Sequence, residues 1–339
     1  MGQLGRLSAP VQIRFLLRFS AEIRTRTENS DRHAKSSAPA KATIPPMSSS
    51  RPPVRGAERF TRSFANHGEG PFWDSRGGRL LCMDVLAASV VAIDTEGGVR
   101  RYPVPSKAAT VIRHRSGPGF VLATEHGLVL ADSELATFEP LARVVLDPTV
   151  RTNDGGCDPL GSFVIGTMNY DGDSDKGAVY RVTPDGEVAQ ILSPVTISNG
   201  LQWSADGTRV FYIDTPTRRV DAFDVDDNGA WSNRRPHIEI TDTPGLPDGM
   251  AIDEEGGLWV ALWGAGAVNH YDTSGRLVDT ISVPGVTQTS SCTFGGADRT
   301  VLFVTTSRQG LPDDREPDAG AVFAVEVGVR GAHPLEFAG

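Results

Sequence analysis

A recurring polar position is the feature of this sequence best suited to do chemistry. Acidic or amide residues stand close to glycine at widely separated points, and a hydroxyl residue takes the corresponding place near the end. The set is Glu69, Asn153, Asn199, Asp248 and Ser291. Oxygen ligands of these kinds suit Ca²⁺, Mg²⁺ or Mn²⁺, and Zn²⁺ is also compatible. Any one of these residues could simply serve a turn, but their common register favours a divalent-cation site.

Six sequence repeats must bring these residues together. Each repeat has a hydrophobic strand with an apolar anchor, then a turn and a second strand. The anchors are Leu80, Phe120, Phe163, Val210, Leu258 and Leu302, at spacings of 40, 43, 47, 48 and 44 residues. A period of 40–50 residues with about four strands per unit is typical of a β-propeller. We therefore expect an all-β fold, a six-bladed propeller with four-stranded blades.

Equivalent positions in a propeller lie at one height around its axis. Counting back 10 or 11 residues from each anchor reaches Glu69, Ala109, Asn153, Asn199, Asp248 and Ser291. We expect these residues to lie in loops before the strands and to form a ring on the axis. A parallel βαβ fold would need helical patterns between strands, and the sequence has none. A β-sandwich would not explain the regular period.

The body of the chain, from about Asn66 to about Gly310, resembles the regucalcin/gluconolactonase/luciferin-regenerating enzyme family of six-bladed propellers. The stretches that carry the resemblance are Gly68–Trp73, Arg151–Gly155, Gly166–Met168, Ile197–Leu201, Val220–Asp224, Ser232–Arg235, Pro247–Met250, Leu258–Ala261 and Thr289–Gly296. Each stretch is short, but their combination in this order is specific.

The resemblance implies a role for each of five residues. It implies that Glu69, Asn199 and Asp248 bind the metal, and that Asp248 is also the catalytic base. It implies that Asn153 and Arg151 hold the substrate. The repeat count reaches four of these positions independently, whereas Arg151 comes from the resemblance alone.

One departure from the family concerns Asp171. Some relatives carry a substrate-contacting acidic residue three positions after the Gly166–Met168 motif, and Asp171 stands there in a loop unlike theirs. Asp171 is therefore a candidate substrate contact, and the identity of the substrate stays open. The loop imitates the spacing of a calcium-binding loop but lacks its glycine and final glutamate. We interpret Asp171–Lys176 as an ordinary acidic loop that could cover the site.

The first 59 residues differ in composition from the rest. They hold 11 Lys/Arg and 4 Asp/Glu, a net of +7, whereas residues 60–339 hold 22 and 38, a net of −16. Their Ser, Pro and Ala content predicts a disordered extension, because too little apolar surface is available to offset the entropy lost on ordering. An Arg-rich transit peptide and a true translation start at Met47 are the alternatives. The propeller is expected over residues 60–339.

Deleting residues 1–46 is accordingly expected to leave folding and activity intact. The measurement compares the melting temperature and the turnover of the shortened and the full-length chain. Aggregation of the shortened chain, or loss of most of its melting temperature, would contradict a dispensable extension.

Composition also limits the cellular compartment and the classes of binding partner that we expect. The three cysteines, Cys82, Cys157 and Cys292, lie far apart, which excludes a disulfide framework and favours a reducing compartment such as the cytoplasm. The acidic body argues against nucleic acid as a partner, and no apolar run is long enough to span a membrane. We find no GxSxG elbow, HExxH or phosphate-binding loop.

Together these features predict a metal-dependent hydrolase that opens a small-molecule lactone, such as a sugar lactone, with one divalent ion (Ca²⁺, Mg²⁺, Mn²⁺ or Zn²⁺) and water activated by Asp248. Two alternatives are kept. One is a non-catalytic propeller that binds a divalent metal or a ligand, since fold does not determine function. The other is a hydrolase of other esters or phosphoesters.

Overall fold

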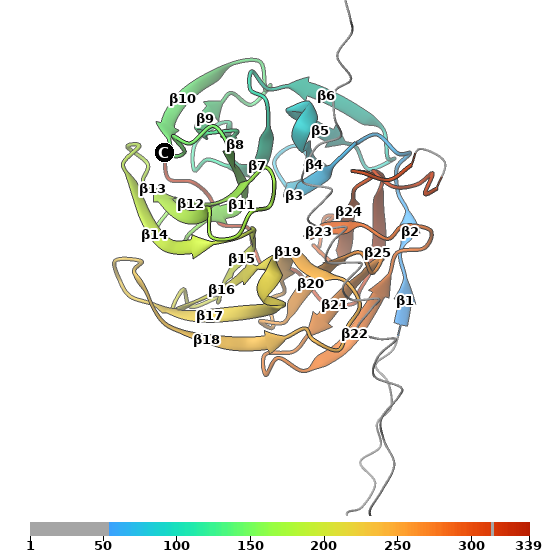
Figure 1. The fold of residues 1–339 in the computed structure, drawn as a ribbon. Helices are drawn as coiled ribbons and strands as arrows, with labels where there is room; N and C mark the ends of the chain where they lie inside the picture. Colours follow the sequence, from blue (N-terminus) through green and yellow to red (C-terminus); the bar gives the residue numbers. More distant parts are fainter. Residues whose placement is uncertain (1–53, 313–314) are drawn as a thin grey trace, which may run out of the picture.

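The structure, a computed structural model, describes residues 54–312 and 315–339. Six antiparallel sheets stand around a central axis as the blades of a β-propeller (Figure 1). The first blade consists of β3 (Gly68–Asp74), β4 (Arg79–Asp84), β5 (Ser89–Ile93) and β6 (Val99–Pro103). The second consists of β7 (Ala109–His114), β8 (Phe120–Thr124), β9 (Gly127–Ala131) and β10 (Phe138–Arg143). The third consists of β11 (Val150–Cys157), β12 (Phe163–Asn169), β13 (Gly177–Val182) and β14 (Val188–Val195).

The last three blades continue the same order. They are β15 (Ser198–Trp203), β16 (Arg209–Asp214), β17 (Arg219–Val225) and β18 (Trp231–Glu239); β19 (Leu246–Ile252), β20 (Leu258–Trp263), β21 (Ala267–Tyr271) and β22 (Leu277–Ser282); and β23 (Thr289–Gly295), β24 (Val301–Thr306) and β25 (Val322–Glu326). Short 3₁₀ turns follow β4 and β16, at Val85–Ala87 and Thr215–Thr217. The expected six-bladed fold is confirmed, and the anchor strands are the second strands of the blades.

The ring is closed by strands from the N-terminal side of the chain. β2 (Glu58–Arg59) pairs with β25 as the fourth strand of the last blade, and β1 (Val54–Gly56) adds a parallel fifth strand to β22. The described propeller therefore begins at Val54, whereas the sequence pattern placed its boundary after residue 59. These six residues carry little apolar signal because they lie at the outer edge of the ring. Residues 1–53, most of the expected extension, lie outside the described residues.

Hydrophobic packing between the blades holds the ring together. The described residues form six core clusters, one at each junction between neighbouring blades. The cluster between the last blade and the first, for example, packs Trp73, Leu80 and Val91 against Phe303 and Val322. The junction that closes the ring thus also buries apolar surface, which is the physical basis for a closed propeller.

Each innermost strand bends at the ring position. The register of the pairing shifts at Glu69, Ala109 and Asn199, and also beside Asn153, Asp248 and Ser291. The expectation that these residues lie in loops is therefore wrong, because they lie within β3, β7, β15, β11, β19 and β23. A β-bulge re-aims a side chain that the regular pleat would direct elsewhere. Bulges in four of these strands accompany the polar side chains of Glu69, Asn153, Asn199 and Asp248, which line one recess.

The glycines beside the bulges let the blades approach one another closely. A Cβ on Gly249 would lie 2.1 Å from the Ser291 Oγ atom of the next blade, and one on Gly70 would lie 2.5 Å from the carbonyl oxygen of Thr110. Any side chain at either position would push two blades apart near the axis.

Within the described residues, no helix is long and apolar enough to cross a membrane. The three cysteines are buried and free.

Candidate active site

Five of the six predicted site residues line one recess at an end of the axis. They are Glu69 on β3, Arg151 and Asn153 on β11, Asn199 on β15 and Asp248 on β19. The recess has a volume of about 40 Å³, enough for an ion and a few waters. The innermost strands of four blades therefore bring together residues that are up to 179 positions apart in the sequence (69 to 248).

The other predicted positions lie elsewhere. Asp171 is exposed at the turn that follows β12, and the recess is lined there by its neighbour Gly172. The Asp171 side chain thus does not reach the recess in this structure, and its role as a substrate contact stays a prediction. Ser291 lines a separate, larger cavity below the ring rather than the recess. Ala109, the sixth position of the ring, has no polar group to contribute.

A chain of hydrogen bonds sets the orientation of the two amides. The Arg151 Nη1 atom donates to Asn153 Oδ1 at 2.7 Å, and Asn153 Nδ2 donates to Asn199 Oδ1 at 3.0 Å. Asn199 Nδ2 donates to Thr215 Oγ1 at 2.7 Å, and that hydroxyl donates to the carbonyl oxygen of Pro247 at 2.8 Å. The Asn199 amide nitrogen is thus used by Thr215, and its oxygen, which accepts from Asn153, has a second lone pair that a ligand could use.

The two carboxylates of the recess lie in a poorly solvated environment. Burial, and after it the charge of Asp154, raises the pKa of Glu69 to about 8, against the opposing effects of the Gly70 amide and Arg151. Burial and the neighbouring charge of Glu69 likewise hold the pKa of Asp248 well above its usual range. Acidic groups whose ionisation is opposed by burial and by neighbouring negative charge are typical of a functional site.

These residues fit a divalent cation chemically. Glu69 and Asp248 form no ion pair with a described residue, and a buried pair of carboxylates is stabilised by a cation of charge 2+. The Asn199 oxygen supplies a third, neutral ligand. Among the described residues, no group of three or more His, Cys, Asp or Glu is placed to hold a metal ion. The candidate set is consistent with that result, because it has only two such residues and an amide.

Arg151 has an unusual environment for a charged side chain. It is fully buried, and its Nε and Nη2 atoms have no hydrogen-bond partner among the described residues. Burial lowers its pKa to about 10, and its guanidinium lies 5.8 Å from the centroid of the Tyr170 ring. The Tyr170 hydroxyl donates to Glu125 Oε1 at 2.9 Å. Tyr170 therefore holds the group in place on one face while two donor nitrogens stay unused.

Several residues of the recess carried no signal in the sequence. Thr215 and Trp263 line it from the 3₁₀ turn after β16 and from the end of β20, positions outside the repeated register. His67 also lines it, with its Nδ1 atom 2.9 Å from Ser307 Oγ and its ring edge-on to Trp263. Burial and the charge of Arg151 lower the pKa of His67 to about 3, so it is neutral at physiological pH. Only the position of His67, two residues before Glu69, could have drawn attention.

The raised pKa of Glu69 predicts how stability depends on pH without metal. Between its ordinary value and about 8, the folded state keeps a proton that the unfolded state loses, so the free energy of unfolding decreases as pH rises. The lowered pKa of His67 acts in the opposite sense only below its ordinary 6.5. From about pH 7 to pH 8.5, we therefore expect metal-free protein to lose on the order of 1 kcal/mol.

Chemical unfolding at a series of pH values measures this loss, and Glu69→Gln is the control. The variant has no ionisable group at this position, so its stability should change less over the same range. An equal slope in both proteins would show that Glu69 does not titrate there. Addition of a divalent cation at about pH 8.5 should restore stability in the unmodified chain by preferential binding to the folded state.

Fold and site together define a six-bladed β-propeller with an acidic and amide site at one end of its axis. A profile of the SMP-30/gluconolactonase/LRE-like region matches residues 67–308. The chain is 36% identical over 285 residues to regucalcin of Xenopus laevis, and the aligned region covers 80% of this chain and 95% of that protein. It is 33% identical over 278 residues to the putative sugar lactone lactonase YvrE of Bacillus subtilis (strain 168), with the same coverage.

A solved structure supports the same relationship. The calcium-binding protein regucalcin of Agrobacterium tumefaciens superposes with a TM-score of 0.79 at 28% sequence identity, over 84% of this chain and 98% of that one. The chain belongs to the SMP-30/gluconolactonase/LRE-like family. The predicted resemblance is confirmed.

Proposed function

We propose that this protein is a metal-dependent lactonase that opens a sugar lactone or a similar small cyclic ester. The observation that carries the proposal is the recess itself, where two carboxylates with raised pKa values face an amide oxygen and an unsatisfied buried guanidinium. This set combines a candidate base, cation ligands and donors for substrate oxygens. The Bacillus subtilis relative is named a putative sugar lactone lactonase, which supports hydrolysis of this class.

In this proposal, Glu69, Asn199 and Asp248 would hold one divalent ion, with Ca²⁺, Mg²⁺, Mn²⁺ and Zn²⁺ as candidates. When bound, the ion would supply Lewis-acid polarisation of the lactone carbonyl. In the proposed reaction, Asp248 takes a proton from the attacking water as the general base. The Agrobacterium relative is named a calcium-binding protein, which supports a bound divalent ion in the proposal.

Arg151 and Asn153 orient the substrate in the proposed reaction. The free Nε and Nη2 atoms of Arg151 are donors for a carbonyl or hydroxyl oxygen, and a buried guanidinium is stabilised when it finds acceptors. The recess of about 40 Å³ is too small for a sugar lactone, so substrate entry requires the covering segments to move. One of these is the β12–β13 connection, whose Gly172 lines the recess and whose Asp171 would then come within reach.

A panel of aldonolactones tests the proposed function. Hydrolysis is followed by acid release at constant pH, with metal-stripped protein and with protein reloaded with each ion. We expect turnover above background for at least one lactone, and only with metal. Relative rates on lactones and phosphotriesters separate lactonase from phosphoester hydrolase activity. Binding of the ion with no turnover of any ester would instead favour a propeller that binds a metal without catalysis. The small volume of the recess is also compatible with that function.

The setting and partners belong to the same proposal. We place the protein in the cytoplasm, since its three buried cysteines are free and a reducing compartment keeps them so. The proposed partner is the small-molecule lactone, with neither nucleic acid nor membrane involved.

A further inference from the structure

A second cavity, with a volume of about 510 Å³, lies below the ring. The innermost strands line the recess with residues at or before their bulges, such as Glu69, and line this cavity with the residues that follow, such as Phe72. It is the larger space, yet the carboxylates of the ring face the recess, so the proposed reaction does not use it. Its size is in the range typical of small-molecule sites.

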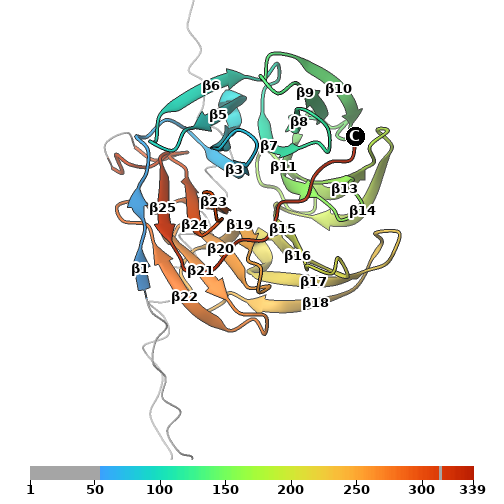
Figure 2. The same ribbon diagram turned by 180° about the vertical axis from the view of Figure 1, so that it is seen from behind.

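The C-terminal segment forms one wall of this cavity. Figure 2 shows the segment after β25 crossing the back of the ring toward the blade of β13. Main-chain hydrogen bonds hold it at both ends: Ala332 N donates to Ile252 O at 3.1 Å, and Phe337 N donates to His114 O at 2.9 Å. Between them, residues 333–335 line the cavity without main-chain hydrogen bonds among the described residues.

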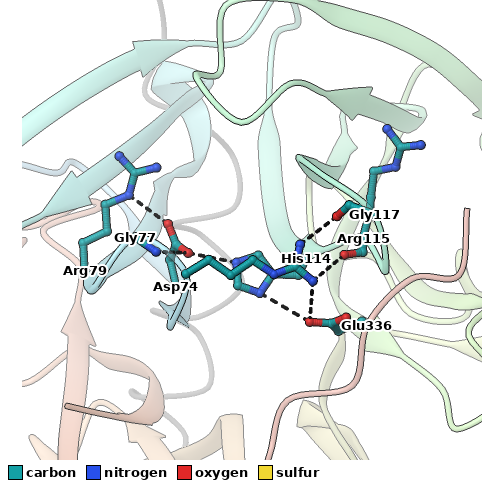
Figure 3. Close-up of polar contacts among 8 residues, drawn as sticks. Asp74, Gly77, Arg79, His114, Arg115, Gly117 and Glu336 are labelled. Carbon is teal, nitrogen blue, oxygen red and sulfur yellow. Dashed lines mark hydrogen bonds and ion pairs between the residues drawn. The ribbon is translucent and has the colours of Figure 1, made fainter. Parts of the chain in front are cut away.

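Polar side chains anchor the far end of the segment. Glu336 accepts a hydrogen bond from Arg76 at 2.7 Å and lies 3.7 Å from His114 Nδ1. The other ring nitrogen of His114 is 2.9 Å from Asp74 Oδ1, and Asp74 also pairs with Arg79 (Figure 3). The adjacent Phe337 is fully buried between the second and third blades. The wall formed by the segment is therefore fixed, and the cavity is a built feature of the fold.

Most charged groups that line the cavity already have partners. Asp206 accepts hydrogen bonds from Ser204 and Thr208, and Glu254 pairs with Arg299. A similar pattern holds for Asp253, which accepts from the Trp259 indole and the Gly257 amide and lies near His270. These acidic groups have no unmet need for a ligand.

Arg113 and Asp154 are the exceptions among these lining groups. Arg113 donates only to two main-chain carbonyls, of Ile112 at 2.7 Å and of Gly155 at 3.0 Å, and it forms no ion pair with a described residue. Two of its five N–H groups are thus used. Asp154 also forms no ion pair with a described residue and accepts a hydrogen bond from the Gly155 amide, although its negative charge and the positive charge of Arg113 stabilise each other through space. Burial lowers the pKa of Arg113, so its charge is held at a cost in free energy.

Aromatic and aliphatic side chains line part of the cavity that Arg113 shares. The Arg113 guanidinium lies 5.7 Å from the centroid of the Phe72 ring. Trp203, Phe294 and Met250 also line the cavity. A cation in such a wall, without a counter-charge in contact, is complementary to an anion with an apolar body.

We propose that the cavity below the ring binds a small organic carboxylate, with its carboxylate on Arg113 and its apolar body against Phe72 and Trp203. The site is separate from the recess and independent of the lactonase proposal. Its chemistry distinguishes it from a solvent-filled channel, because binding should require the negative charge of the ligand and the positive charge of Arg113.

Isothermal titration with benzoate, phenylacetate and hexanoate tests the proposal, with benzamide as a neutral match for benzoate. We expect one site for at least one acid, and at least about tenfold weaker binding of benzamide. Arg113→Gln should weaken carboxylate binding by about tenfold or more. Arg151→Gln removes the guanidinium at the recess and should leave binding in this cavity unchanged.

A second variant keeps the charge and blocks the space. A Cβ on Gly156 would lie 3.7 Å from Arg113 Nε, in ordinary van der Waals contact, so Gly156→Val places a branched side chain over the guanidinium without a main-chain clash. It should abolish binding while the melting temperature changes little. No binding of any of the three acids up to about 10 mM, or binding that survives both Arg113→Gln and Gly156→Val, would overturn the proposal. Loss of binding only in Arg151→Gln would assign the ligand to the recess.

Discussion

Asp248→Asn is expected to lower kcat for lactone hydrolysis by about 10²–10⁴-fold, the usual contribution of a general base. Asparagine has nearly the same size and keeps one oxygen toward the recess, so the metal can still bind. It cannot accept a proton from water at neutral pH. The loss should therefore persist at saturating metal, which steady-state kinetics with subtraction of spontaneous hydrolysis can measure.

Asn199→Ala is the matched control for this variant. Asn199 offers only a neutral oxygen, so its removal should weaken metal affinity, and excess metal should recover much of the rate. The two variants thus separate a ligand from a base. If Asp248→Asn retains a near-normal kcat at saturating metal, Asp248 is a ligand only. The base would then have to be sought elsewhere, with Asp171 as the next candidate.

Removal of the metal is expected to abolish turnover altogether. Glu69 and Asp248 are held together by the fold at a place where both resist ionisation, so a cation should stabilise the folded state as well as the reaction. Chelation should stop hydrolysis, and Mn²⁺, Mg²⁺, Ca²⁺ or Zn²⁺ should restore it at unequal rates. The melting temperature should rise with each ion that binds.

The control for this experiment is the fold of the stripped protein. The core clusters between the blades do not involve the carboxylates of the recess, so the circular dichroism spectrum should stay that of a β-protein. Full activity in chelator, with no metal found by elemental analysis, would contradict metal dependence and return attention to Arg151 as the group that polarises the substrate.

Sequence patterns were sufficient for the architecture and for most of the site. The period of the anchors from Leu80 to Leu302 predicts six blades because every blade repeats the same local alternation of strands and turns. The common register then predicts that Glu69, Asn153, Asn199 and Asp248 meet, and all four line one recess. Both inferences depend only on periodicity, which is a property of the linear chain.

Other features depend on contacts between distant parts of the chain, and no local pattern carries them. The bulges that aim the ring residues arise from pairing within each blade. The role of Thr215 as partner of Asn199, and the strands before residue 60 that close the ring, were likewise decided by packing. The cavity below the ring needs residues from the C-terminal segment near those of β7 and β11. The sequence alone determined which residues repeat and with what period, whereas only ring closure decided which unrepeated side chains surround them.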